Sequence, residues 1–292
     1  MGVHRVLGAA LPVFDMLRTI SNKLASDVDP KPPAPTYVRR PKKMITEAVV
    51  VDVSQDWVAA CGLQDRFMEI PCATSQHLTY YARCRQMRAL GGDCFQFVPL
   101  PGRRVGLAVA DASGKGLPAA LIVANVQSSL RTAALFAPEH PAAVVSAVNR
   151  QLHACSPVDR YATLFYGVFD GNLRTLHYVN AGHNPAVVIR RGSAVAWLDA
   201  SAPPVGLFAE TLYQTEAVQL YPGDLIVAYT DGIVEATNTA SEEWAVEGLL
   251  AVVKRCRTRQ PESIVEAAFA ALDEFSGDNQ TDDATILAAL VH

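Results

Sequence analysis

The sequence predicts an α+β fold built in layers, and the order of its segments carries that prediction. Several short segments alternate apolar and small or polar residues with period two, which is typical of β-strands. Two long apolar stretches follow the first strands directly, and a second pair precedes the last strand. Because the helices come in pairs and do not alternate with the strands, the order favours an α+β sandwich over a doubly wound parallel sheet.

The first regular elements are two strands followed by two helices. Strands are expected at Asp93–Leu100 and Arg104–Ala110, with Pro101-Gly102 as the turn between them. Helices are expected at Leu117–Leu135 and Pro141–Ala154, and proline suits the first turn of the second helix because its fixed φ is already helical.

The second half of the chain is rich in predicted strands. Turn signals at Gly171-Asn172 and Pro222-Gly223 predict hairpins. The expected strands are Thr163–Phe169, Arg174–Val179, Ala186–Arg190, Ala194–Leu198, Tyr213–Leu220 and Leu225–Tyr229, followed by helices at about 242–256 and 261–275 and a last strand at Ala284–Leu290.

Residues 1–43 differ in composition from the rest of the chain. They carry eight basic and three acidic residues, whereas residues 44–292 carry 17 basic and 26 acidic ones. Five prolines between positions 30 and 41 predict an extended linker. Apolar residues in the first 24 positions recur at helical spacing, so we expect an amphipathic helix that rests on the body of the protein, on a partner or on a membrane surface.

The overall composition excludes several classes of protein. Half of the 292 residues are hydrophobic and 18% are charged, below the usual share of roughly a quarter, which excludes a wholly disordered chain. The net charge of −4 argues against nucleic-acid binding through bulk charge. The six cysteines form no C-x-x-C pair, so neither a disulfide framework nor a zinc site is expected. Free thiols suggest a cytoplasmic protein.

Acidic side chains fall where predicted strands begin or end. They are Asp93, Asp111, Asp231 and the adjacent pair Asp282-Asp283. Aspartate is rare inside strands, and like charges brought together repel. If strand pairing brings these strand ends together, the carboxylates need a cation, and such oxygen ligands suit Mg²⁺ or Mn²⁺.

Each aspartate taken alone has a simpler explanation. Asp-Gly after a strand, as at Asp231, is usual in turns, Asp111 could begin a helix cap, and Asp282-Asp283 could lie in a solvated loop. The glycine-rich segment Ser113–Gly116 lacks the spacing of a phosphate-binding P-loop. Residue chemistry alone therefore leaves both a metal site and ordinary turns open.

Five segments resemble the signature motifs of PPM-type metal-dependent serine/threonine phosphatases, in the bacterial branch of stage II sporulation E and RsbU proteins. The segments are GGDCF (91–95), ADASGKG (110–116), NAGHNP (180–185), YTDGIVEATN (229–238) and DDATIL (282–287). Each motif alone is short, but five in the family's order are highly specific. The segment Leu63–Pro71 also resembles the linker helix that precedes this domain in many members.

This resemblance implies a division of the chain and an architecture. Residues 1–43 would be the amphipathic segment and basic linker, 44–75 a regulatory linker helix, and 76–292 the phosphatase domain. The domain would consist of two stacked antiparallel sheets flanked by pairs of helices. Two Mn²⁺ or Mg²⁺ ions would bind at one end of this sandwich.

The resemblance also implies a ligand for each ion. Asp111 would bridge both ions, and the Ala112 carbonyl would bind the first. Asp93 would hold the first ion largely through water, whereas Asp231 and Asp282 would complete the second site. Asp282 is preferred to Asp283 because the first residue of the pair matches the family's ligand. The four aspartates are therefore the expected catalytic residues.

The sequence departs from the family's pattern at several positions. Cys94, Phe95 and Gln96 follow the GGD motif, where an aromatic and a second acidic residue are common. Ser113 stands where the eukaryotic members have a histidine, so no histidine general acid is expected. Lys115 replaces a common histidine, and we expect His183 to shape a turn and Cys94 to be a packed thiol.

The resemblance implies hydrolysis of phosphoserine or phosphothreonine on a signalling protein, by a water activated between two metal ions. The expected partner is a phosphorylated STAS-type anti-sigma-factor antagonist, with an upstream activator and a homodimer as further hypotheses. One alternative is a non-enzymatic interaction module of the same fold that switches by binding a partner. Another is a metal-dependent hydrolase for a different class of ester.

Overall fold

The computed structural model describes residues 53–68, 73–192, 194–256, 258–277 and 279–292. All of them belong to the compact unit Asp52–His292. The expected N-terminal helix and proline-rich linker lie outside the described residues, as does Cys72.

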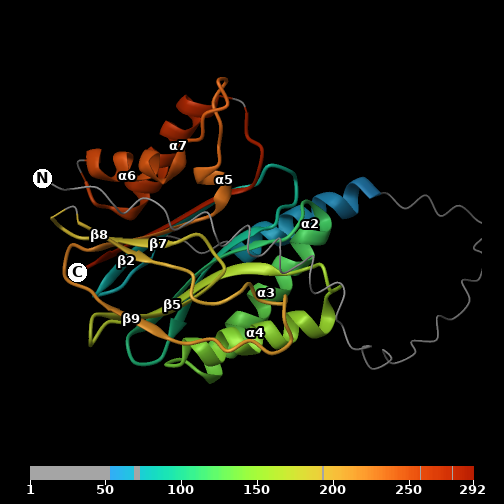
Figure 1. Ribbon diagram of the computed structural model, residues 1–292, viewed down its shortest axis with the longest axis horizontal. Coiled ribbons are helices and arrows are strands. Elements are labelled where there is room, and N and C mark those ends of the chain that lie inside the picture. Colours follow the sequence, from blue (N-terminus) through green and yellow to red (C-terminus); the bar gives the residue numbers. More distant parts are fainter. Residues whose placement is uncertain (1–52, 69–72, 193, 257, 278) are drawn as a thin grey trace, which may run out of the picture. The chain divides into compact units, whose positions relative to one another are not determined.

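Two antiparallel sheets form the centre of the domain (Figure 1). The six-stranded sheet has the order β1 (Ala73–Thr74), β2 (Leu78–Arg85), β11 (Ala284–Val291), β10 (Leu225–Tyr229), β7 (Ala186–Ile189) and β8 (Val195–Leu198). The five-stranded sheet has the order β3 (Asp93–Leu100), β4 (Arg104–Ala112), β5 (Ala162–Asp170), β6 (Thr175–Ala181) and β9 (Glu216–Gln219).

Helices cover the outer face of each sheet (Figure 1). The pair α3 (Leu117–Phe136) and α4 (Pro141–Cys155) packs on the five-stranded sheet. The pair α6 (Ala245–Arg255) and α7 (Pro261–Ser276) packs on the six-stranded sheet, next to the one-turn helix α5 (Asp231–Val234). Helix α2 (Val53–Met68) contacts α3 and β3. The result is the layered α+β sandwich that the order of elements predicts.

Strand β4 shows how the period-two pattern builds two hydrophobic layers. Val105, Leu107 and Val109 belong to the core between the sheets, whereas Ala108 and Ala110 belong to the layer beneath α3 and α4. Successive side chains of a strand point to opposite faces, so large residues fill the space between the sheets and alanines allow the helices to approach.

Strand β2 and helix α5 were not anticipated from the sequence. Strand β2 carries Arg83 and Arg85, charged residues that obscure its strand pattern. In the structure both guanidinium groups lie over the ring of Phe269 in α7 and pair with acidic residues of that helix. The long arginine side chains therefore bury their stems at the interface between sheet and helix.

The turn Pro222-Gly223 corrects one expectation. It reverses the chain, but it joins β9 to β10, which belong to different sheets, so the two strands do not form a hairpin. The Gly223 amide donates a hydrogen bond to the Val291 carbonyl of β11, and this holds the crossing between the sheets. Strand β9 is also shorter than expected, since it spans only Glu216–Gln219.

Helix α3 is a core helix, although its length and apolar composition would also suit a membrane span. Its buried side chains include Ile122, Val126 and Leu130, which join the hydrophobic layer on the five-stranded sheet. The helix that the sequence predicts at Leu117–Leu135 is therefore confirmed, and one face of it packs on the five-stranded sheet.

The aromatic core between the sheets should dominate stability. Phe97 is 1% exposed and its ring centroid lies 4.2 Å from that of Tyr80, whereas Phe136 at the end of α3 is 86% exposed. We expect Phe97→Ala to lower the free energy of unfolding by about 3–5 kcal/mol. The matched control Phe136→Ala should change it by less than about 0.5 kcal/mol. Urea unfolding of both variants tests this, and equal losses would contradict the assignment of the core.

Candidate metal centre

Strand register places two of the predicted aspartates opposite each other. Asp93 at the start of β3 is the cross-strand partner of Asp111 near the end of β4. In the other sheet, Asp231 lies two residues after β10 and Asp282 lies two residues before β11, and these two strands are antiparallel neighbours. Each sheet therefore contributes two carboxylates at an end of its strands.

Asp93 joins the two sheets at this end. One of its carboxylate oxygens accepts hydrogen bonds from the hydroxyls of Thr230 and Thr285, both at 2.7 Å. The Asp93 residue is 1% exposed. Burial raises the pKa of Asp93 to about 8, against the effect of the two hydroxyls and with further contributions from Asp283 and Asp231. A carboxylate from one sheet thus lies within hydrogen-bonding distance of the other.

Asp111 carries the least compensated charge of the group. Burial and then the neighbouring charges of Asp93, Asp231 and Asp282 raise the pKa of Asp111 to about 9. The pKa of Asp231 is also raised, by burial and by Asp282. Strand pairing therefore brings the aspartates at the strand ends near one another, as expected from the sequence. The concentration of negative charge that results favours a bound cation.

The adjacent residues Asp282 and Asp283 have different surroundings. The two oxygens of Asp283 accept the backbone N–H groups of Met87 at 2.7 Å and Gly92 at 2.6 Å, and the residue is 8% exposed. The Asp282 carboxylate is 40% exposed and pairs with Lys115 at 2.6 Å. Asp283 is thus engaged in holding the GGD segment, which supports the choice of Asp282 as the ligand.

Two glycines keep space beside these carboxylates. A Cβ on Gly232, the residue after Asp231, would overlap the Asp283 carbonyl oxygen. A Cβ on Gly92 would lie 3.2 Å from the Ala112 carbonyl oxygen. The Ala112 amide is held in turn by the Gly92 carbonyl at 2.9 Å. Glycine at both positions therefore allows the four strand ends to approach closely.

The donor set fits hard divalent cations. It consists of carboxylate oxygens and one backbone carbonyl, and the two most strongly raised pKa values belong to Asp93 and Asp111. Within the described part of the chain, no group of three or more His, Cys, Asp or Glu side chains is arranged so that it could hold a metal ion as it stands. One oxygen of Asp93 is engaged by threonines and Asp282 by Lys115, so both carboxylates have competing partners.

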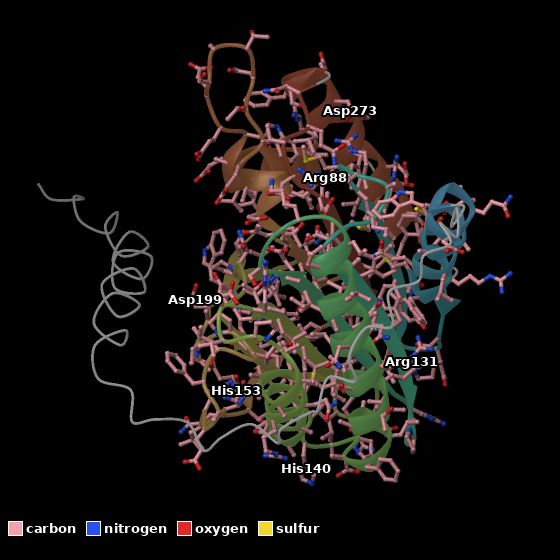
Figure 2. The ribbon with its side chains drawn as sticks, turned by 90° about the vertical axis from the view of Figure 1, so that its right-hand side faces the viewer. Arg88, Arg131, His140, His153, Asp199 and Asp273 are labelled. Carbon is pink, nitrogen blue, oxygen red and sulfur yellow. The ribbon has the colours of Figure 1, made fainter. Side chains whose placement is uncertain are left out.

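Several residues around the site were not predicted from the sequence. Thr230 and Thr285 are the neighbours of predicted motif residues in YTDG and DDAT, which is the signal that could have revealed them. Gln64 of α2 is 6% exposed and bonds the backbone of Gly91, donating to its carbonyl at 2.8 Å and accepting its N–H at 3.2 Å. Arg88 lies between β2 and β3, 3.5 Å from where a Cβ on Gly116 would be (Figure 2).

The remaining expectations concern Cys94 and His183. Cys94 is buried in the layer under α3, and burial raises its pKa, so it is a packed thiol. The His183 ring contacts the Thr163 hydroxyl at 2.8 Å, and its backbone N–H is bonded to the Asn180 side chain at 2.9 Å. Burial lowers the pKa of His183 to about 4, which keeps the ring neutral within its turn.

Solved structures share this architecture. The SiaA-PP2C domain of Pseudomonas aeruginosa matches with a TM-score of 0.72 and 18% identity, over 82% of this chain and 96% of that one. RsbX in complex with magnesium matches at 0.59 with 16% identity, over 75% and 98% of the chains. PstP in complex with two manganese ions matches at 0.54 with 17% identity, over 74% and 98%. The fold is that of the PPM-type phosphatases.

Sequence comparison identifies the family. The family model described as stage II sporulation protein E (SpoIIE) matches residues 101–292, and the chain belongs to that family. The phosphoserine phosphatases RsbP and RsbU of Bacillus subtilis are 28% and 27% identical over 155 and 152 residues, each about 51% of this chain. The aligned parts are 38% of RsbP and 44% of RsbU, so the chain spans less than half the length of these relatives.

Burial of the Asp111 carboxyl should destabilise the protein when metal is removed, because a group that is ionised in the unfolded chain at neutral pH must take up a proton on folding. We expect Asp111→Asn to raise the melting temperature in chelator at neutral pH by about 2–4 °C, which corresponds to roughly 1 kcal/mol in a domain of this size. Because its pKa rises from 3.8 to about 9 on folding, the gain should grow from about pH 4 to about pH 9.

A matched aspartate provides the control. Asp170 accepts the N–H groups of Asn172 and Leu173 and pairs with Arg104 at 2.8 Å, and these partners lower its pKa although burial opposes them. Asp170→Asn should therefore lower the melting temperature, the opposite sign to Asp111→Asn. If both variants were destabilised in chelator, the Asp111 charge would be compensated in the metal-free protein.

Proposed function

We propose that this protein is a Mn²⁺- or Mg²⁺-dependent phosphoprotein phosphatase that hydrolyses phosphoserine or phosphothreonine. The observation that carries the proposal is the meeting of four aspartates, two from each sheet, at one end of a PPM-type sandwich. Burial and repulsion between the carboxylates raise the pKa values of Asp93, Asp111 and Asp231, and a bound cation would relieve both. Two divalent ions, when bound, would activate a water for attack on phosphorus and neutralise the phosphate oxygens.

The chain's own residues divide this work. Asp111 is influenced by all the other acidic groups of the site and is suited to bridge the two ions, with the Ala112 carbonyl at the first. Asp231 and Asp282 would hold the second ion. Asp93 would complete the first site, oriented by the two threonine hydroxyls that already bond it. Cys94, the residue next to Asp93, is buried in the core and is not assigned as a nucleophile, since the metal-activated water needs none.

The proposed substrate is a phosphorylated STAS-type anti-sigma-factor antagonist in the cytoplasm. The support is the resemblance to RsbP and RsbU, which are named phosphoserine phosphatases. An upstream activator would act on residues 44–75, for which the amide pair between Gln64 and Gly91 provides a contact next to Asp93.

Activity should depend on Asp231 and on divalent cations. We expect chelated protein to be inactive toward a phosphoserine peptide and p-nitrophenyl phosphate, and Mn²⁺ or Mg²⁺ to restore turnover. Asp231→Asn should lower turnover by about 100-fold or more while the protein stays folded. Asp199→Asn, on the surface after β8 (Figure 2), is the matched control and should retain full activity.

Three outcomes would contradict this proposal. Restoration by Zn²⁺ alone would disagree with an all-oxygen ligand set. Turnover by Asp231→Asn close to that of the wild type would refute the ligand assignment. A folded wild-type protein that binds a phosphorylated STAS partner but hydrolyses no phosphoester would favour the non-enzymatic interaction module.

We also propose that helix α2 is a regulatory and dimerising element. Trp57 and Phe67 are each 38% exposed, and Leu63 is 55% exposed, so much of the apolar surface of this helix faces solvent in the monomer. The helix also lines a small apolar pocket with Leu117 and Leu121 of α3. Since α3 begins five residues after Ala112, movement of α2 against α3 would be transmitted to the metal centre.

The double variant Trp57→Ala, Phe67→Glu should change oligomeric state and metal-dependent turnover together. Both side chains contribute exposed apolar surface to α2, and burying such a surface against a partner favours association. The variant removes that surface. Light scattering and phosphatase assays measure the two effects. Leu212→Glu is the control, because Leu212 is an apolar residue outside α2 and is 82% exposed. A folded double variant with unchanged mass and rate would refute the proposal.

A further inference from the structure

Lys115 is distinguished by its contact with the acidic site. In the described part of the chain, its ion pair with Asp282 is the one salt bridge formed by any of the four predicted ligands. The ammonium lies 2.6 Å from an oxygen of Asp282 and 2.9 Å from the carbonyl oxygen of Thr281. Its charge also acts on Asp231, whose pKa it lowers although burial and Asp282 raise it overall. A single positive charge thus contacts one predicted ligand of the second ion, Asp282, and acts electrostatically on the other, Asp231.

The loop that carries Lys115 connects the two halves of the site. It joins β4, which ends at Ala112, to α3, which begins at Leu117. Gly114 and Gly116 on either side of Lys115 have φ of 94° and 71°, values that side-chain-bearing residues rarely adopt. The lysine therefore extends from a tight turn on the five-stranded sheet to the segment that precedes β11 in the six-stranded sheet.

The ion pair is exposed enough to be exchanged. The side chains of Lys115 and Asp282 are 42% and 40% exposed. Ion pairs in such positions contribute little to stability, and the flexible stem of lysine allows the ammonium to move away at small cost. The buried pair of Arg104 with Asp170 differs, because the Asp170 side chain is 4% exposed and is also held by backbone amides.

We infer that Lys115 is an internal counter-cation for the second ion site, which neutralises Asp282 in the metal-free protein and is displaced when a divalent ion binds. This inference rests on the proposed function, because the ion it competes with is the second ion of that centre.

Competition of this kind has a definite direction. A divalent ion that binds between Asp231 and Asp282 must break the ion pair of Lys115 with Asp282. The bound ion is then repelled by the nearby ammonium group. Both effects weaken binding of that ion and leave the ion between Asp93 and Asp111 less affected. Removing the lysine charge should therefore tighten the binding of one of the two ions. If Lys115 instead positioned Asp282 for the metal, removing the charge would weaken that binding.

Metal binding by the full chain, measured without substrate, tests the inference. The protein is freed of metal with chelator and titrated with Mn²⁺, and free Mn²⁺ is followed by electron paramagnetic resonance. We expect Lys115→Met and Lys115→Gln to bind one of two ions about two- to fivefold more tightly than the wild type, as expected for the loss of an exposed ion pair. Lys115→Arg should resemble the wild type. The difference should narrow as NaCl is raised.

Lys254→Met is the matched control, because it removes the same charge from an exposed position at the end of α6. It should leave both affinities unchanged, so an equal effect of Lys254→Met would show that net charge alone is responsible. Thermal unfolding in chelator establishes that each variant is folded.

The outcomes separate this inference from the proposed function. Unchanged or weaker Mn²⁺ binding by folded Lys115→Met, with a wild type that hydrolyses phosphopeptide, would overturn the role of Lys115 and leave the phosphatase intact. A wild type that binds no Mn²⁺ would refute the metal centre itself. Tighter binding by Lys115→Met and Lys115→Gln, with a lower Mn²⁺ requirement for turnover, is the result that supports the inference.

Discussion

The hydrogen bonds from Thr230 and Thr285 to Asp93 join the two sheets at the place where both present carboxylates. A buried carboxylate is costly unless it is bonded or paired. The two hydroxyls provide part of that compensation, and they come from the opposite sheet, since Thr230 directly follows β10 and Thr285 lies within β11. This junction links the two sheets at the end where Asp111, the cross-strand partner of Asp93, and Asp231, the residue after Thr230, are placed.

Asp283 supplies the rigid part of the junction. Its two oxygens accept backbone amides on both sides of the turn before β3, and its carbonyl leaves no room for a side chain on Gly232. Asp282, its neighbour, is partly exposed and pairs with Lys115. The two adjacent aspartates therefore have different surroundings, since Asp283 is held by backbone amides and Asp282 pairs with Lys115.

Helix α2 reaches the same junction from outside the sandwich. The side chain of Gln64 forms two hydrogen bonds with Gly91, two residues before Asp93. Gln127 of α3 lies between α2 and β3, where its side chain amide is directed at the carbonyls of Phe67 and Phe95. Buried amides that bond backbone groups define position more strictly than apolar contacts, because misplacement leaves them unpaired. The helix is therefore tied to the candidate metal centre through hydrogen bonds from side-chain amides to the backbone.

The sequence by itself determined the paired helices, most of the strands and the positions of the acidic motifs, because period-two and helical patterns and turn residues are local signals. It also identified the family through motif order. Strand β2 was hidden by arginines that pack on Phe269, and the turn Pro222-Gly223 could not reveal that its two strands enter different sheets. Only the tertiary structure decided which strands are neighbours, and hence that Asp93 lies opposite Asp111, that two threonines bond Asp93 and that Lys115 pairs with Asp282. These contacts join residues separated by up to 192 positions, and no local pattern encodes the partner of a side chain at such a distance.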